Sequence, residues 1–282
     1  MRVALPTTLE DAVEALASEP GAQLLAGGTD FCVEVNFAQR RPPAVVALRR
    51  VEALRAFDVA ADRVTIGAGT TYTDMERSEL ARVLPALAAA ARTVGSPQIR
   101  NAGTLGGNVA TASPAGDTLP LLVALDAVVR LAGTAGERTV PLAELVTGVK
   151  RTGIAPDEVI VEVSLARHDG SQHFLKVGTR NAMVIAIASA AVVLDLEDHR
   201  VRVGLGSVGP VPLRASAAEA HAAAAIDWDT LRAGEDELER FGELAAQAAS
   251  PITDHRSTAD YRRRAVQVIA RRGLERCLRD AA

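Results

Sequence analysis

Two glycine-rich stretches decide the fold of this chain: GSPQIRNAGTLGGNVATASPAGDTLPLLVALDA at residues 95–127 and LLAGGTD at residues 24–30. Each contains a Gly-Gly pair, and the later pair lies between Thr104 and Asn108, two small side chains that form hydrogen bonds. Glycine adopts positive φ readily, which lets successive backbone N–H groups converge on one anionic oxygen. Neither GTLGGN nor LLAGGTDF contains Lys or Arg. We therefore expect backbone dipoles to hold the anion, as suits a pyrophosphate bridge better than a triphosphate with its metal.

An acidic residue follows the later glycine pair at a short distance. Asp117 lies nine residues beyond Asn108, and we expect its carboxylate to accept hydrogen bonds from sugar-like hydroxyls. For either Gly-Gly pair alone, a tight turn is the simpler interpretation. The two pairs taken together favour the binding site.

The composition is that of a soluble globular protein. The 282 residues include 31 Lys+Arg and 35 Asp+Glu, giving a formal net charge of -4, and 48% are hydrophobic. This length fits one large domain or two to three small ones. The longest nearly unbroken apolar run, Ala182–Leu194, is shorter than the roughly 20 residues that span a bilayer, and Met1–Ala17 carries acids where a signal peptide is apolar. We expect a cytoplasmic protein with no membrane span.

The cysteines and histidines do not form a metal-binding pattern. Two cysteines are too few for an iron–sulfur cluster and too distant in sequence for a zinc pair, and no two histidines have helical spacing. We expect no metal site and treat the cysteines as small buried residues. The residues concerned are Cys32, Cys277, His168, His173, His199, His221 and His255.

The hydrophobic pattern divides the chain into three parts. It predicts a module at residues 1–54, a second at residues 55–167 and a C-terminal domain at residues 171–282, with the polar segment His168–Ser171 as linker. In the first two parts, a capping box at Thr7–Glu10 opens a helix, and further elements are expected at 22–26, 44–48, 56–68 (a hairpin), 84–94, 119–125, 128–131 and 159–165. The third part is expected to contain a meander at 172–179, 190–196 and 200–207, then helices at 215–225, 228–249 and 258–279.

Two other patterns suggest functions that we reject. Gly204–Gly209 matches G-x-G-x-x-G, but Pro210-Val211-Pro212 cannot open the helix that a dinucleotide site needs, so a turn is expected there. Arginines accumulate from Arg262 to Arg279, as in a nucleic-acid or membrane-surface helix. Acidic residues are interspersed and aromatic residues are only 3% of the chain. We expect a solvated or subunit-facing helix and no nucleic-acid partner.

The two glycine stretches together resemble the FAD-binding subunit or domain of the molybdenum hydroxylases, the family of xanthine dehydrogenase and carbon monoxide dehydrogenase. The similarity extends over essentially the whole chain. Within the family, SPAGDTLPLLVALDA and Thr147-Gly148 are most similar to the xanthine-dehydrogenase type. Further segments that carry the resemblance are 156–160, 174–180, 206–214 and 251–264.

This resemblance implies an α+β protein with the PCMH-type (vanillyl-alcohol-oxidase-like) FAD-binding fold: two α/β modules that hold FAD and a C-terminal α+β domain of an antiparallel sheet plus helices. Carried over by position, Asp117 would hold ribityl or ribose hydroxyls, Ile160 would pack near the flavin, and Lys176 would approach the cofactor. For Ile160 a plain core position in a strand stays open, and for Lys176 a solvated lysine. The residues expected to line the diphosphate and ribityl chain, mostly through backbone, are Leu24, Leu25, Ala26, Gly27, Gly28, Thr29, Asp30, Phe31, Thr104, Leu105, Gly106, Gly107 and Asn108.

The implied activity is electron transfer within a heteromeric oxidoreductase. Electrons would come from iron–sulfur clusters on a 2Fe-2S small subunit, would originate at a molybdopterin-binding large subunit, and would leave FAD for NAD, a quinone or oxygen. Some relatives place a tyrosine near the flavin ring, but Tyr72 and Tyr261 lie in no matching motif, so no acid–base residue is assigned. Two alternatives remain open: a non-redox assembly subunit that keeps the fold, and a self-contained flavin oxidoreductase.

Overall fold

The N-terminal part is built on a small parallel sheet. The computed structural model describes residues 2–282. Its first helix is capped by the Thr8 side chain, which accepts a hydrogen bond from the backbone N–H of Asp11, one position later than the capping box expected at Thr7–Glu10. The sheet has the order β1-β3-β2. Its elements are β1 (Arg2–Ala4), α1 (Leu9–Ser18), β2 (Gln23–Leu25), α2 (Phe31–Asn36) and β3 (Ala44–Ala47), followed by two 3-10 turns, η1 (Leu48–Arg50) and η2 (Glu52–Arg55).

The next part contains a five-stranded antiparallel sheet with the order β4-β5-β10-β6-β7. The predicted hairpin at 56–68 is confirmed as its first two strands. The strand that the sequence predicted at 159–165 returns from the end of this part to the centre of the sheet. The strands are β4 (Phe57–Val59), β5 (Arg63–Gly67), β6 (Val128–Gly133), β7 (Gly136–Pro141) and β10 (Val159–Ala166).

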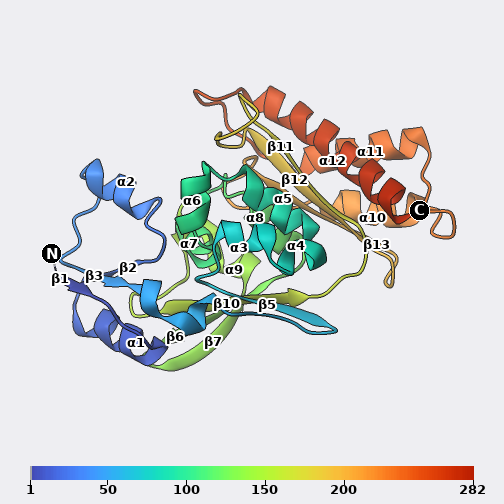
Figure 1. Ribbon diagram of the computed structural model, residues 1–282. Helices are drawn as coiled ribbons and strands as arrows, with labels where there is room; N and C mark the ends of the chain where they lie inside the picture. Colours follow the sequence, from blue (N-terminus) through green and yellow to red (C-terminus); the bar gives the residue numbers. More distant parts are fainter. Residues whose placement is uncertain (1) are drawn as a thin grey trace.

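Short helices cover one face of this sheet and separate it from the C-terminal sheet (Figure 1). Three of them, α6, α7 and α8, lie inside the stretch 95–127, and the first two flank Gly103. The helices are α3 (Tyr72–Arg77), α4 (Leu80–Val83), α5 (Pro85–Thr93), α6 (Pro97–Ala102), α7 (Leu105–Thr111), α8 (Leu119–Ala124) and α9 (Leu142–Leu145), and a small ribbon of β8 (Val146–Gly148) and β9 (Arg151–Thr152) follows.

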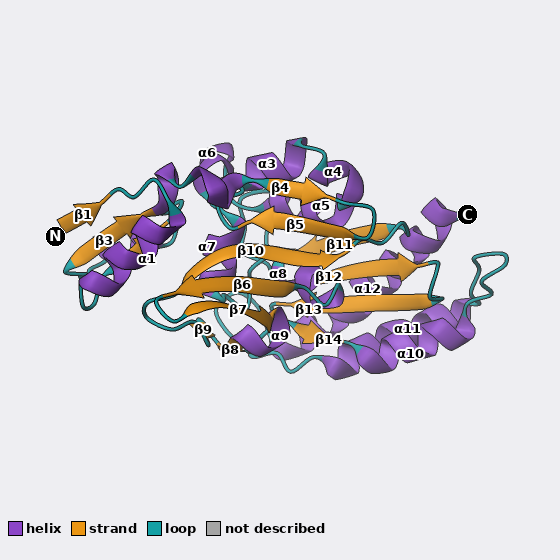
Figure 2. Ribbon diagram, turned by 90° about the horizontal axis from the view of Figure 1, so that it is seen from below, coloured by secondary structure: helices purple, strands orange, loops and turns teal. Residues whose placement is uncertain are grey.

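The C-terminal part is a four-stranded antiparallel sheet with helices packed on its outer face (Figure 2). The predicted meander is confirmed. The predicted helix start at Trp228 is wrong, because Asp227 Oδ1 accepts hydrogen bonds from the N–H groups of Asp229 and Thr230 and holds a turn there. The elements are β11 (Gln172–Val177), β12 (Ala188–Asp195), β13 (Arg200–Gly206), β14 (Leu213–Arg214), α10 (Ser216–Ala225), α11 (Glu235–Ala248) and α12 (Ala259–Ala281).

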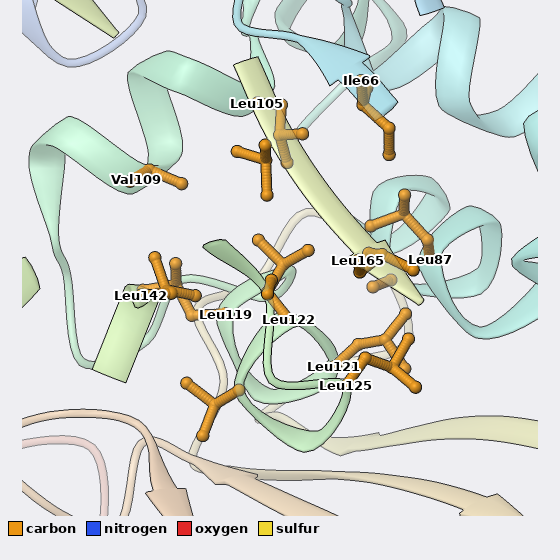
Figure 3. Packing of buried hydrophobic residues seen from close by; sticks show 14 of the residues in the cluster. Ile66, Leu87, Leu105, Val109, Leu119, Leu121, Leu122, Leu125, Leu142 and Leu165 are labelled. Carbon is orange, nitrogen blue, oxygen red and sulfur yellow. The ribbon is translucent and has the colours of Figure 1, made fainter. Parts of the chain in front are cut away.

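Three apolar cores hold these layers together. The first joins α1 and β3 to the outer face of the five-stranded sheet. The second, and central, core fills the space between the two antiparallel sheets, where leucines of α7 and α8 meet Ile66, Leu87 and Leu165 (Figure 3). The third lies between the C-terminal sheet and α10–α12. Since the central core includes Phe174 and Val193, burial of apolar surface ties the C-terminal sheet to the preceding part.

The arginines of α12 are largely neutralised within the chain. Arg262 is buried, where it donates hydrogen bonds to the carbonyl oxygens of Ile187 and Ser207 and pairs with Asp254. Arg271 pairs with Glu239 and also with Glu235 and Glu275. Arg262 is therefore structural, and this differs from the solvated helix that the sequence suggested. Within residues 2–282, no helix is both long and apolar enough to cross a membrane.

The G-x-G-x-x-G match has a packing explanation. Gly204 and Gly206 lie in β13, where the strand passes over the first turn of α8. A Cβ added to Gly204 would lie 1.8 Å from the carbonyl oxygen of Pro120, and one added to Gly206 would lie 2.7 Å from Pro120 Cγ. These two glycines therefore allow close approach of strand and helix, whereas the sequence suggested a turn.

The substitution Gly204→Ala tests this contact. The added methyl group must push β13 away from α8, so we expect the free energy of unfolding to fall by about 1–3 kcal/mol or more. The matched control is Gly234→Ala, where the nearest atom to an added Cβ is Glu237 Cγ at 3.9 Å. Thermal unfolding of both variants gives the comparison, and equal stability would contradict the packing explanation.

Candidate functional site

The two glycine-rich stretches meet in space. The first pair follows β2, with Gly28 at a φ of +73°, a conformation that side chains disfavour. A Cβ added to Gly27 would lie 1.9 Å from the carbonyl oxygen of Ala102 and 2.9 Å from the Cα of Gly103. The first glycine turn thus lies directly against the backbone that leads into α7.

The two segments offer different hydrogen-bond donors. The backbone N–H groups of Gly27 through Asp30 donate to no acceptor within residues 2–282. In the second segment, by contrast, the N–H of Leu105 donates to Thr70 O, that of Gly106 to Ala68 O, and that of Gly107 to Thr104 Oγ1. The sequence suggested that both segments present free N–H groups. The structure leaves them free in the first, because the second uses its own to anchor the start of α7.

A side-chain donor remains in the second segment. Thr118, which is fully buried, donates from Oγ1 to Asn108 Oδ1 at 2.5 Å. This bond orients the Asn108 amide, because an oxygen held by a hydroxyl leaves the Nδ2 group to donate elsewhere. Asn108 is therefore the side chain through which this segment can contact an anion.

Asp117 forms a buried ion pair with Lys176 of the C-terminal sheet. Each of these side chains is 7% exposed. Asp117 Oδ2 accepts hydrogen bonds from Lys176 Nζ and, at 3.2 Å, from Thr93 Oγ1. Burial raises the pKa of the Asp117 carboxyl, and the Lys176 ammonium and the Thr93 hydroxyl oppose that rise. Lys176 is thus a buried partner of Asp117, so the alternative of a solvated lysine is excluded.

The second oxygen of the same carboxylate lacks a partner. Asp117 Oδ1 is buried and accepts no hydrogen bond within residues 2–282. Buried polar atoms are almost always satisfied, so a buried acceptor without a partner indicates a ligand or a water. A hydroxyl donor of the sugar type would satisfy it. The observation agrees with the role expected for Asp117.

Tyr72 belongs to the site, although its sequence context did not indicate it. It opens α3, and its backbone N–H donates to Gly103 O at 3.1 Å. Its ring packs on Gly103, where an added Cβ would lie 2.7 Å from Tyr72 Cε2. Burial raises the pKa of the Tyr72 phenol, and the negative charges of Asp117 and Asp30 raise it further. The capping-box pattern at Thr71–Asp74 predicts the start of α3. That Tyr72 lies against Gly103 is visible only in the structure.

The remaining residues predicted for the site differ in their surroundings: some lie in the core and others lie nearer the surface. Leu105 points into the central core and is fully buried, so its side chain is not available to a ligand (Figure 3). Ile160 is also buried in this core, on β10, as a plain core residue would be. Phe31 heads α2, and its ring lies 5.8 Å from the Arg40 guanidinium. Of the others, Leu24 and Leu25 end β2, Ala26 follows it, and all three are half-buried; Thr29 continues the first turn.

Polar contacts hold α2 and the first turn to α7 and to the turn between β8 and β9. Lys150 Nζ lies 2.9 Å from Glu34 Oε1, and Thr111 Oγ1 donates to Asp30 Oδ2 at 3.4 Å. The hydrogen bond from Lys150 lowers the pKa of Glu34. Because α2 buries none of its residues, these polar contacts and the Gly27 approach fix its position.

Comparison with known proteins gives a consistent result. A family profile described as the FAD binding domain in molybdopterin dehydrogenase matches residues 1–167, and one described as the CO dehydrogenase flavoprotein C-terminal domain matches residues 173–277. The xanthine dehydrogenase FAD-binding subunit of Escherichia coli O157:H7 is 32% identical over 94% of this chain and 91% of its own length.

Two further comparisons extend this result. The nicotine 6-hydroxylase medium subunit of Paenarthrobacter nicotinovorans is 31% identical over 97% of this chain and 96% of its own length. The solved structure of reconstituted CO dehydrogenase from Oligotropha carboxidovorans superposes with a TM-score of 0.91 and 28% identity, over 100% of this chain and 98% of that one. The α+β FAD-binding fold is confirmed by these structures. The chain therefore belongs to the FAD-binding subunits of the molybdenum hydroxylases, the flavoprotein subunits of molybdopterin-dependent oxidoreductases.

Proposed function

We propose that this chain is the electron-transfer subunit of a heteromeric molybdenum hydroxylase of the xanthine-dehydrogenase type. When bound, FAD supplies the redox chemistry, taking electrons from iron–sulfur clusters of a partner subunit and passing them to an external acceptor. The single observation that carries the proposal is the meeting of the two glycine segments beside an unpartnered Asp117 oxygen. The protein's part is to bind the cofactor, orient it and keep it from side reactions.

The residues present suit the two polar parts of FAD. The free N–H groups between Gly27 and Asp30 would hold the diphosphate, and the oriented Asn108 amide would add a side-chain donor. Asp117 Oδ1 would accept a hydroxyl hydrogen of the ribityl chain. Each role is taken by an atom that has no partner inside the protein, so FAD binding would disrupt none of the hydrogen bonds described above.

Lys176 keeps the Asp117 acceptor in its ionised form. Burial favours the neutral carboxylic acid, whose proton would occupy one of the two oxygens. The ammonium group on β11 counters this effect from the C-terminal sheet. Cofactor binding in the second module would therefore depend on a residue of the C-terminal part.

The proposed partners are a molybdopterin-binding large subunit and an iron–sulfur small subunit. The relatives support this proposal through their names, which include a medium subunit of nicotine 6-hydroxylase and a subunit of a 6-hydroxypseudooxynicotine dehydrogenase complex. The proposed division of labour leaves the organic substrate to the large subunit. The xanthine type rests on SPAGDTLPLLVALDA and on the E. coli relative.

Titration of the flavin-free chain with FAD tests the proposed function. We expect the unmodified chain to bind FAD and to show flavin absorption bands, and Gly107→Val to weaken binding by about a hundredfold or more, because its side chain would take up space beside Asn108. Within 4 Å, an added Cβ at Gly107 meets only Thr104 Oγ1, so the apoprotein should remain folded.

The matched control for that experiment is Gly234→Val, at an open position before α11. It should bind FAD normally. An unmodified chain that takes up no FAD would overturn the cofactor proposal. A chain that binds FAD but does not pass electrons from a reduced partner complex to any acceptor would instead be an assembly subunit.

A second prediction concerns Lys176→Met. Without the ammonium group the pKa of Asp117 should rise further, so a larger fraction of the carboxyl is protonated at a given pH and FAD affinity should fall by about tenfold. Because the acceptor is the deprotonated form, affinity should recover as the pH is raised through that higher pKa. Arg82→Met is the control, since its pair with Glu79 is exposed. Binding curves across pH decide the point, and a parallel pH profile for the two variants would contradict the role of Lys176.

A further inference from the structure

Tyr72 is fixed by its backbone at the junction of the two glycine segments. The Thr71 side chain accepts a hydrogen bond from the N–H of Asp74, and Asp74 Oδ2 accepts one from the N–H of Thr71, so the start of α3 is closed on both sides. The N–H of Tyr72 is bonded to Gly103 O. The backbone of Tyr72 is therefore anchored beside Gly103, and its buried ring packs on that residue.

Gly103 is the shared neighbour of Tyr72 and the first glycine turn. An added Cβ on Gly103 would meet the Tyr72 ring, and an added Cβ on Gly27 would meet the Cα of Gly103. The ring and the turn with free N–H groups thus lie against the same residue. Gly103 therefore links the phenol ring to the turn whose N–H groups are free.

The hydroxyl group of Tyr72 is available to a ligand. The residue is 4% exposed, and its hydroxyl forms no hydrogen bond within residues 2–282. The hydroxyl oxygen is not one of the fully buried polar atoms that lack a hydrogen-bond partner, so it retains some contact with solvent. A tyrosine hydroxyl with a buried ring usually has a hydrogen-bond partner. Within residues 2–282 no protein group supplies that partner, so a ligand can supply it.

The surrounding charges favour a neutral donor here. Asp30 and Asp117 both lie close enough to raise the pKa of the phenol, which keeps it protonated throughout the physiological range. A protonated phenol donates one hydrogen bond without adding charge. An anion bound by a segment that lacks Lys and Arg needs donors of this kind.

We propose that Tyr72 donates a hydrogen bond to a phosphate oxygen of the bound cofactor's diphosphate. The inference rests on the proposed FAD binding and adds to it a residue that the glycine motifs do not contain. Tyr72 would act from the face of the site opposite the first glycine turn, across Gly103. The diphosphate would then be held by backbone N–H groups on one side and by a phenol on the other.

The test compares Tyr72→Phe with the unmodified chain and with Tyr261→Phe, a control at an exposed tyrosine of α12. Titration of flavin-free protein should show FAD binding about tenfold weaker for Tyr72→Phe and unchanged for Tyr261→Phe. The melting temperature of the flavin-free protein should be the same for all three, because the hydroxyl bonds to nothing in the chain. A purely structural role would lower that temperature.

Ligand fragments separate the diphosphate from the rest of the cofactor. ADP should compete with FAD less well for Tyr72→Phe than for the unmodified chain, whereas riboflavin, which has no phosphate, should compete equally. FAD affinity unchanged by Tyr72→Phe, or a loss seen equally with riboflavin, would overturn the inference while leaving the proposed function intact. If the unmodified chain itself fails to bind FAD, the proposed function fails and this inference falls with it.

Discussion

The contact between Gly27 and the Ala102–Gly103 backbone is the constraint on which the site depends. Two segments from different modules approach so closely that no side chain fits between them. The approach sets the first turn, with its unpaired N–H groups, beside the segment that leads into α7. It also explains why the second segment can use its own N–H groups for internal bonds. The first segment keeps its N–H groups free for a ligand, and the second offers a glycine against which the first can pack.

A second constraint is the ion pair that crosses from the α7–α8 segment to β11. Burying two charges is unfavourable unless they are paired and hydrogen-bonded, and here Lys176 and Asp117 are paired while one carboxylate oxygen is left free. Removing one partner from such a pair is far more disruptive than its net contribution to stability suggests. The arrangement places a residue of the C-terminal sheet at the candidate site, and so ties that site to the C-terminal part of the chain.

Much of the fold follows from periodicity, and the rest depends on contacts that no local pattern encodes. In the β4–β5 hairpin and the β11–β13 meander, the strands have alternating or continuous apolar residues and are separated by recognisable turn residues. Both were predicted. The start of α11 was missed because Asp227 closes a turn through its own side chain. Gly204 and Gly206 were interpreted as a turn because close packing against Pro120 is invisible in a sequence.

The candidate site shows the same division. Gly-Gly pairs and Asp117 are visible as residue types, and the fold brings the pairs together. Which N–H groups remain free depends on Ala68 and Thr70, which precede α3 and carry no motif. Tyr72 was passed over because its neighbours match nothing known, and only the position of Gly103 reveals it.

The packing of α8 beneath β13 has a consequence for the architecture of the whole subunit. The two family profiles divide the chain near residue 170, yet α8 contributes to the same apolar core as Phe174 and Val193. A fragment that ends at that boundary would expose the leucines of α8 and leave the Asp117 carboxylate without its counter-ion Lys176. The two family profiles therefore cover two parts of the chain that share one apolar core and one buried ion pair. A change of packing in either part affects the other.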